Sequence, residues 1–229
     1  FRVKEAGSAS LIFSSAAVRA NDGYGTNVFR TGAQALFNLI SEEKPLPPSE
    51  IAAGTPEAPD ISSPTHPDSN KWYSNNDPEF TWKLPSDVTA VRLLNDKYPT
   101  SRPSMIYSPP ISEKQLENIK DDIWYFHAQF RNTSGWGEIS HFRFQIDTET
   151  PSQFDITEIP RKDPTEPEAR FIFDAKDITS GVDQYEVQID SGSSEIWRDD
   201  GSHRYETAVL EPGKHTLIAK AVDKAGNSL

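Results

Sequence analysis

Apolar and polar residues alternate along much of the chain after residue 70. In residues 125–131, small and aromatic apolar side chains fall on one face, and more polar side chains fall on the other. Successive side chains of a β-strand point to opposite faces, so this period of two predicts half-buried strands. The pattern recurs in residues 141–147, 185–190 and 217–221. Clusters of Gly, Asn, Asp, Ser and Pro separate the runs and predict tight turns. A short helical turn is expected only in residues 112–120.

An internal repeat relates the two halves of residues 70–229. A shift of 91 positions places Phe80 on Phe171 and, far downstream, Phe126 on Leu217. One constant offset at two distant anchors indicates duplication. A period of about 90 residues is the size of an immunoglobulin-like sandwich.

The repeat predicts two superposable β-sandwiches, residues 69–150 and 151–229. Four residues on apolar faces of period two are predicted to be core residues: Trp82, Phe126, Phe171 and Leu217.

Two further segments precede the repeat. Residues 1–40 hold apolar runs on either side of a turn-rich stretch, and they predict a few strands and a loop. Residues 41–68 contain seven of the 18 prolines. Proline fixes φ and removes a backbone donor, so this stretch is predicted to be an extended, semi-rigid linker. Ile51 and Ile61 are its candidate apolar anchors.

Composition narrows the class of protein and of partner. The 229 residues carry a formal net charge of −12, which repels phosphate backbones and argues against nucleic acid as a partner. Cysteine is absent, so disulfides and thiolate-bound metals are excluded. No apolar run approaches the roughly 20 residues of a membrane helix. The chain begins within a strand-like pattern, and we interpret it as part of a longer precursor whose signal or anchor lies elsewhere.

Turn-rich residues 21–27 are a candidate calcium site, because Asn21, Asp22 and Asn27 offer oxygen ligands. A structural turn is the competing interpretation, since Asn and Asp serve turns equally well. No other cofactor is indicated. Aromatic side chains near predicted loops are candidates for stacking on sugar rings, with core packing as the competing interpretation. They are Trp72, Tyr73, Trp136 and Trp197.

No catalytic motif is present. The five histidines lack the spacing of a zinc hydrolase. His127 and His141 are expected to face each other on neighbouring strands as a polar pair. Adjacent carboxylates such as Asp121 and Asp122 fall in predicted turns, where Asp favours local hydrogen bonds. A glycosidase would need two carboxylates converging in a cleft.

Two resemblances to known families refine these expectations. Residues 1–15 followed by 20–27 resemble the C-terminal strands of a bacterial cohesin-like domain. Cohesins are jelly-roll sandwiches that hold dockerin modules or act as adhesive modules. This resemblance implies that residues 1–40 are half of a domain, completed by the missing N-terminal half or by a partner chain.

Residues 70–229 resemble bacterial Ig-like and fibronectin type III-like modules. The resemblance lies in Trp82 within residues 80–85, and in the turns at residues 121–126, 211–217 and 223–227. It implies an all-β chain of tandem immunoglobulin-like β-sandwiches, preceded by the terminal strands of a jelly-roll-like sandwich. One departure is that the inward register favours Trp124 over Tyr125, which argues against a tyrosine corner.

The sequence therefore predicts a non-catalytic, extracellular or cell-surface protein, anchored through regions outside this chain. Its Ig-like modules would be spacers for a cohesin-like interaction module in adhesion or scaffolding. The partner would be a protein or a surface polysaccharide. The alternative is a carbohydrate-binding accessory region of a polysaccharide-degrading system.

Overall fold

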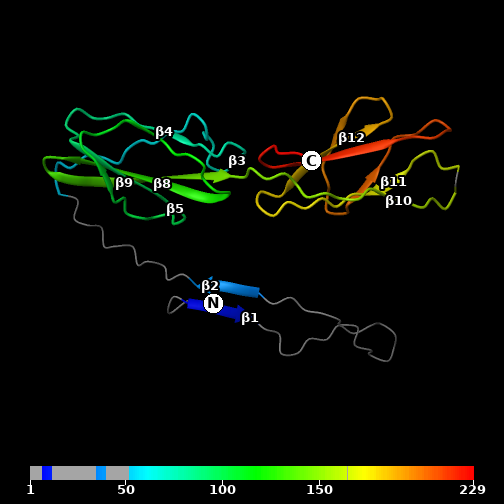
Figure 1. Ribbon diagram of the computed structural model, residues 1–229, viewed down its shortest axis with the longest axis horizontal. Coiled ribbons are helices and arrows are strands. Elements are labelled where there is room, and N and C mark those ends of the chain that lie inside the picture. Colours follow the sequence, from blue (N-terminus) through cyan, green and yellow to red (C-terminus); the bar gives the residue numbers. More distant parts are fainter. Residues whose placement is uncertain (1–6, 12–34, 40–51, 164) are drawn as a thin grey trace. The chain divides into compact units, whose positions relative to one another are not determined.

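The computed structural model describes residues 7–11, 35–39, 52–163 and 165–229 (Figure 1). These residues form strands and no helix, so none of them lies in a helix that could cross a membrane. The chain divides into two compact units, Phe1–Glu50 and Ile51–Leu229. In the first unit, strands β1 (Gly7–Leu11) and β2 (Ala35–Leu39) pair antiparallel.

The first sandwich of the second unit has seven strands in two sheets. They are β3 (Trp72–Tyr73), β4 (Glu79–Thr81), β5 (Ala90–Asp96), β6 (Met105–Tyr107), β7 (Glu113–Gln115), β8 (Asp122–Asn132) and β9 (Gly135–Ile146). One sheet has the order β3-β9-β8-β5-β6, and the other pairs β4 with β7. All pairs are antiparallel except β3 with β9.

Aromatic side chains fill the first sandwich. Phe80 from β4 stacks on Phe126 from β8, with ring centroids 4.1 Å apart, and both rings are buried. Trp82 is buried beside them and donates its ring N–H to the Ile111 carbonyl at 2.8 Å. The predicted inward face of β8 is confirmed by the burial of Phe126, Ala128 and Phe130.

The second sandwich has six strands in two three-stranded sheets. They are β10 (Thr157–Ile159), β11 (Arg170–Ile172), β12 (Val182–Ile189), β13 (Glu195–Trp197), β14 (Arg204–Glu206) and β15 (Leu217–Asp223). The sheet orders are β10-β11-β14 and β13-β12-β15. Phe173 is fully buried at the centre of the core. Phe171 and Leu217, predicted as core residues, are half-buried and pack at its edge.

The two sandwiches share one strand order. The pair β4-β7 corresponds to β11-β14, and the run β6-β5-β8 corresponds to β13-β12-β15. Equivalent strands begin 91 residues apart at Glu79 and Arg170, and again at Glu113 and Arg204. The predicted all-β fold of tandem sandwiches is therefore confirmed.

Two local predictions are wrong. Residues 112–120 contain strand β7 instead of a helical turn, because Glu113–Gln115 pairs with β4. Residues 55–68, predicted as linker, pack on the first sandwich. Ser62 exchanges backbone hydrogen bonds with Thr81 at 2.9 and 2.8 Å, and Pro59 and His66 are fully buried. Prolines suit this segment because an edge position leaves some backbone N–H groups unused in the sheet.

Candidate metal centre

The predicted calcium residues Asn21, Asp22 and Asn27 lie outside the described part of the chain. The predicted sugar-stacking residues lie within it, but the structure does not bring all four together. Trp197 belongs to the second core, where its ring centroid lies 5.2 Å from that of Tyr185 and 5.5 Å from that of Phe173.

The other three aromatic residues belong to the first sandwich. Trp72 and Tyr73 form the short strand β3 along β9. The Tyr73 ring packs against His66 with centroids 4.6 Å apart. Trp136 lies at the start of β9. The Arg92 guanidinium lies over its ring, with the guanidinium carbon 4.3 Å from the ring centroid. Tyr73 and Trp136 thus already have neighbours within the sandwich.

The predicted histidine pair is present on neighbouring strands. His127 on β8 lies opposite His141 on β9, and their Nδ1 atoms are 2.6 Å apart. His127 is fully buried, and its Nε2 lies 3.1 Å from the Asp96 carboxylate. Burial lowers the pKa of His141, and the charge of His127 lowers it further. These contacts fit a cross-strand polar pair.

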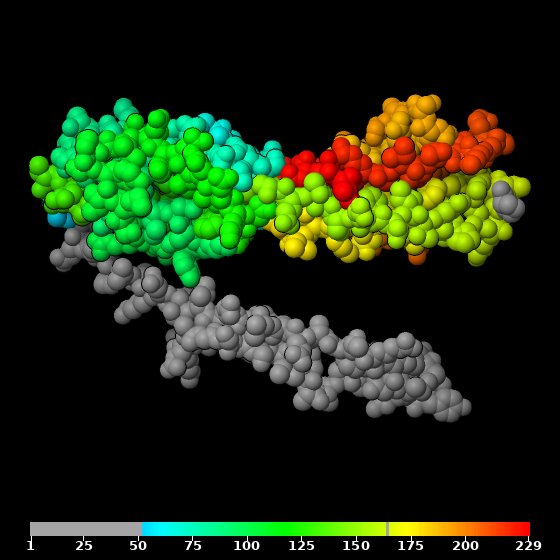
Figure 2. Space-filling model, in the orientation of Figure 1, coloured from blue at the N-terminus to red at the C-terminus, as the bar shows by residue number. Residues whose placement is uncertain are grey.

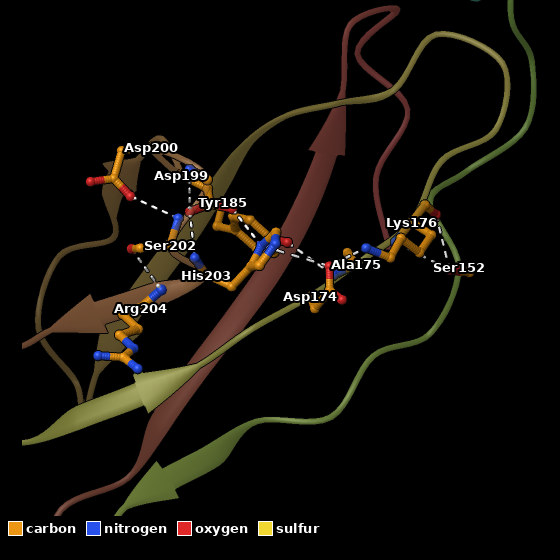
Figure 3. A network of polar contacts seen from close by, with 11 residues as sticks. Ser152, Asp174, Ala175, Lys176, Tyr185, Asp199, Asp200, Ser202, His203 and Arg204 are labelled. Carbon is orange, nitrogen blue, oxygen red and sulfur yellow. Dashed lines mark hydrogen bonds and ion pairs between the residues drawn. The ribbon is translucent and has the colours of Figure 1, made fainter. Parts of the chain in front are cut away.

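A polar network in the second sandwich surrounds His203 (Figure 3). The His203 Nδ1 lies 2.6 Å from the Asp199 carboxylate and 3.7 Å from that of Asp174. The Tyr185 hydroxyl accepts from the Ala175 amide at 2.9 Å, and burial raises the pKa of Tyr185. Asp199 also accepts from the His203 amide at 2.8 Å, and this bond holds His203 at a φ of 57°. The network stabilises a turn.

Three aspartates meet where the chain leaves β9 and enters the second sandwich. Asp147 directly follows β9, Asp177 lies between β11 and β12, and Asp223 ends β15. One carboxylate oxygen of each lies within 4.8 Å of the other two. Asn227 helps to assemble them by donating its side-chain amide to the Asp147 carbonyl at 2.8 Å. Figure 2 shows this C-terminal turn, in red, against the yellow-green segment that follows β9.

Backbone amides fix the Asp177 carboxylate. Its Oδ1 accepts from the amides of Thr179, Ser180 and Gly181 at 3.2, 2.9 and 2.6 Å. Gly181 has a φ of 81°, a left-handed conformation that glycine adopts without strain. The turn therefore presents Asp177 in one defined orientation, with its Oδ2 free of hydrogen bonds from the described residues.

The other two aspartates are buried carboxylates. Asp147 is 0% exposed and Asp223 is 2% exposed. The Asp147 carboxylate accepts from the amides of Glu149 and Ser180 at 3.2 and 3.1 Å. Charged groups are rarely buried without a partner of opposite charge, so this pair of buried carboxylates is unusual.

No cation of the protein neutralises the cluster in the described part of the chain. None of the three aspartates forms an ion pair there with Lys, Arg or His. Burial raises the pKa of Asp147, and the charges of Asp177 and Asp223 raise it further. The arrangement concentrates negative charge and oxygen ligands, which is the chemistry of a site for a hard cation.

Sequence reasoning did not find this cluster. Its members are 30 and 46 residues apart along the chain, and only the tertiary fold joins them. A usable signal was present, since Asp147 ends the alternating run of residues 141–147 and Asp223 lies just after that of residues 217–221.

Two of the hollows among the described residues lie in the second sandwich. The first is lined by Phe154, Ile156, Ala219 and Leu229, with Asp155 as its one ionisable side chain. The second is lined mainly by Arg161, Lys162, Arg170 and Arg204, with Glu166 beside them. Neither brings a nucleophile together with a general base in a protected cleft.

Comparisons with known proteins find similarity to solved structures of fibronectin type III and fibronectin(III)-like domains. No family model and no curated protein matches the chain. Among solved structures, the chain is similar to the chicken CNTN1 FN1–FN3 domains, with 12% identity, coverage of 76% of this chain and 67% of that one, and a TM-score of 0.35. It is similar to the fibronectin(III)-like modules of Clostridium thermocellum CbhA, with 14% identity, coverage of 73% and 88%, and a TM-score of 0.40. It is also similar to a two-domain fibronectin type III segment of chicken tenascin, with 15% identity, coverage of 76% and 94%, and a TM-score of 0.31.

All three TM-scores are below 0.5, so the assignment of the fold rests on the strand order and on the two filled cores. These features define the class as tandem β-sandwich modules of fibronectin type III-like or Ig-like fold.

Proposed function

We propose that the chain is a non-catalytic part of an extracellular surface protein. Its two sandwiches act as spacers for a cohesin-like interaction module that includes residues 1–40. The observation that carries this proposal is the repeated strand order of two sandwiches, each filled by its own aromatic core. Domains with their own cores can fold independently, so two in tandem are suited to setting distance.

The two spacer modules meet near Asp147 in this proposal. The first would include residues 55–68 in addition to residues 69–147, because Ser62 pairs with Thr81. The second would begin after Asp147 and continue to residue 229. A net charge of −12 and the absence of cysteine suit a solvated surface protein that does not depend on disulfides. The partner of the cohesin-like module is a protein or a surface polysaccharide.

Single-molecule pulling of the intact chain tests the spacer role. Two independent modules of about 90 residues should unfold in two separate steps, each releasing about 300 Å of chain. A single step that releases both sandwiches together would contradict the assignment of two modules.

A glycan screen with the intact chain separates the proposal from the carbohydrate-binding alternative. We expect no polysaccharide binding through Trp72 or Trp136. Binding that is lost in Trp72→Ala and Trp136→Ala, but kept in the control Tyr98→Ala, would favour the alternative. Tyr98 suits the control because it is an exposed aromatic side chain. Hydrolysis of a polysaccharide that is lost on mutating one carboxylate would show that the chain is an enzyme.

A further inference from the structure

The geometry points to a calcium ion bound by Asp147, Asp177 and Asp223, with the Ser180 hydroxyl as a further oxygen ligand. Calcium takes six to eight oxygen ligands at about 2.3–2.6 Å, so two ligands on opposite sides of the ion are at most about 5 Å apart. The three carboxylate oxygens lie within 4.8 Å of one another and meet this requirement.

Ser180 supplies an observation that is independent of the acidic cluster. This residue is only 5% exposed, and its Oγ has no hydrogen-bond partner among the described residues. The Ser180 backbone amide donates to the Asp147 carboxylate at 3.1 Å, which places this residue directly beside the cluster. Buried hydroxyl groups are nearly always satisfied. An unsatisfied buried oxygen beside buried carboxylates is suited to serve as a cation ligand.

The charge and the donor atoms select calcium among common cations. Three carboxylates in a largely buried site repel one another unless a cation or protons neutralise them. The cluster contains neither His nor Cys, so it does not suit zinc. Magnesium requires short octahedral bonds and keeps several waters, whereas calcium accepts irregular sites built from protein oxygens.

The position of Asp147 gives this site a mechanical role. Its backbone amide donates to the Tyr73 carbonyl at 3.0 Å in the first sandwich, and its carbonyl accepts from Asn227 in the second. An ion that binds its carboxylate would tie the end of β9 to two turns of the second sandwich. Calcium would thereby stiffen the junction. This mechanical role rests on the proposed spacer function, whereas calcium binding itself does not.

Isothermal titration and thermal unfolding of the intact chain, stripped with EDTA and dialysed, test the site. We expect calcium to bind the cluster and to raise the Tm of the second sandwich by about 5 °C or more at a hundredfold excess over Kd. Magnesium at the same concentration should give less than half of this shift. An equal shift with magnesium would overturn the assignment to calcium.

Two variants and one control locate the ion. Asp177→Asn keeps an oxygen that accepts from the three turn amides but removes a charged ligand, so calcium affinity should fall at least about tenfold. Ser180→Ala should weaken calcium binding several-fold. Without calcium its Tm should be unchanged or higher, since an unsatisfied buried hydroxyl is removed. Asp183→Asn should leave affinity unchanged, because Asp183 is an exposed carboxylate whose ion-pair partner is Arg198 at 3.4 Å.

Three results would overturn the proposal. One is the absence of both binding heat and a Tm shift at millimolar calcium. The second is unchanged affinity in both Asp177→Asn and Ser180→Ala. The third is binding that survives in these variants but is lost in Asp22→Asn, which would place calcium in residues 21–27. None of these results depends on the number of unfolding steps under force, so failure here is distinguishable from failure of the spacer proposal.

Discussion

Trp124 and His215 make the same hydrogen bond in the two sandwiches. The Trp124 ring N–H donates to the Lys120 carbonyl at 2.8 Å, and the His215 Nε2 lies 2.7 Å from the Glu211 carbonyl. Each bond reaches back four residues, and the two rings are 91 residues apart. A carbonyl only accepts, so the His215 Nε2 carries the proton. Different ring N–H groups thus perform in each sandwich the task that a tyrosine hydroxyl performs in a tyrosine corner.

Replacing Trp124 with Phe tests the importance of this bond. The Trp124→Phe variant keeps an aromatic ring but loses the donor to Lys120. The free energy of unfolding of the first sandwich should fall by about 1 kcal/mol. Urea denaturation of the intact chain measures it. The control is Trp72→Phe, because Trp72 makes no side-chain hydrogen bond within the described residues. A loss as large in the control would mean that ring area, and not the bond, is responsible.

The stacked pair of Phe80 and Phe126 should dominate the stability of the first sandwich. Phe126 is 1% exposed, so Phe126→Ala should cost about 3–5 kcal/mol. Phe171 is only half-buried, so Phe171→Ala should lower the free energy of unfolding of the second sandwich by clearly less. Denaturation curves of the two variants give both values. Melting of Phe126→Ala like that of the wild type would contradict the assigned core.

The sequence predicted the sandwiches well because apolar and polar side chains alternate along several of their strands. Alternation revealed the inward face of β8, and the shift of 91 revealed the shared strand order. The prediction of core residues was less accurate in the second sandwich. Phe171 was chosen by its alignment with Phe80, but Phe173, two positions later on the same face, is the residue that is fully buried. Burial depends on the width of each sheet, which a local pattern does not contain.

The proline-rich segment and the candidate site were harder to predict. Proline density indicates an extended backbone, but it does not distinguish a free linker from an edge segment packed on a sheet, as residues 55–68 are. The junction cluster depends on contacts between residues distant in sequence. Hydrogen bonds between the separate turns bring its members together, such as those from Asn227 and from the Ser180 amide to Asp147.

Gly137 tests the packing of the segment before the first sandwich. A Cβ at this position would lie 1.8 Å from the Pro56 carbonyl oxygen. Gly137→Ala should therefore push Pro56 off the sheet, cost about 1–3 kcal/mol, and make residues 52–58 sensitive to limited proteolysis. The control is Gly201→Ala in the second sandwich, where the Cβ would meet no atom within 4 Å and only the φ of 93° is strained. It should not affect proteolysis of residues 52–58. Resistance of this segment in Gly137→Ala would contradict the observed packing.

His66 should make the first sandwich sensitive to mild acid. Its ring is fully buried, with Nε2 3.0 Å from the Asn75 carbonyl and Nδ1 2.9 Å from the Thr65 hydroxyl. The carbonyl only accepts, so Nε2 carries the proton and Nδ1 accepts from Thr65 in the neutral ring. Burial lowers the pKa of His66 below its ordinary value of 6.5, and the bond to Asn75 offsets only part of this.

The sign of the pH effect follows from that lowered pKa. Because the unfolded chain binds the proton on His66 more tightly, stability is full above about pH 6.5 and falls as the pH drops toward the folded-state pKa. The lowered pKa of His141 adds to the same trend. The urea midpoint of the first sandwich should fall between about pH 7.5 and 5.5, and His66→Gln should reduce this slope. A midpoint that rises on acidification, or an unchanged slope in the variant, would contradict the assignment.

The last prediction concerns β1 and β2, which pair with each other and with no other strand in the described part of the chain. A lone two-stranded pair is marginally stable in water, and its edges expose unpaired N–H and C=O groups. The amides of β1 and β2 should therefore exchange hydrogen much faster than those of β8, which lies between β9 and β5. Hydrogen exchange on the intact chain, with its monomeric state verified, measures the difference. Adding a chain that supplies the missing strands should slow exchange in β1 and β2 and leave β8 unchanged. Strong protection of β1 and β2 in the isolated monomer would show that residues 1–40 are self-sufficient or docked on the sandwiches, and their interpretation as half of a cohesin-like domain would then be wrong.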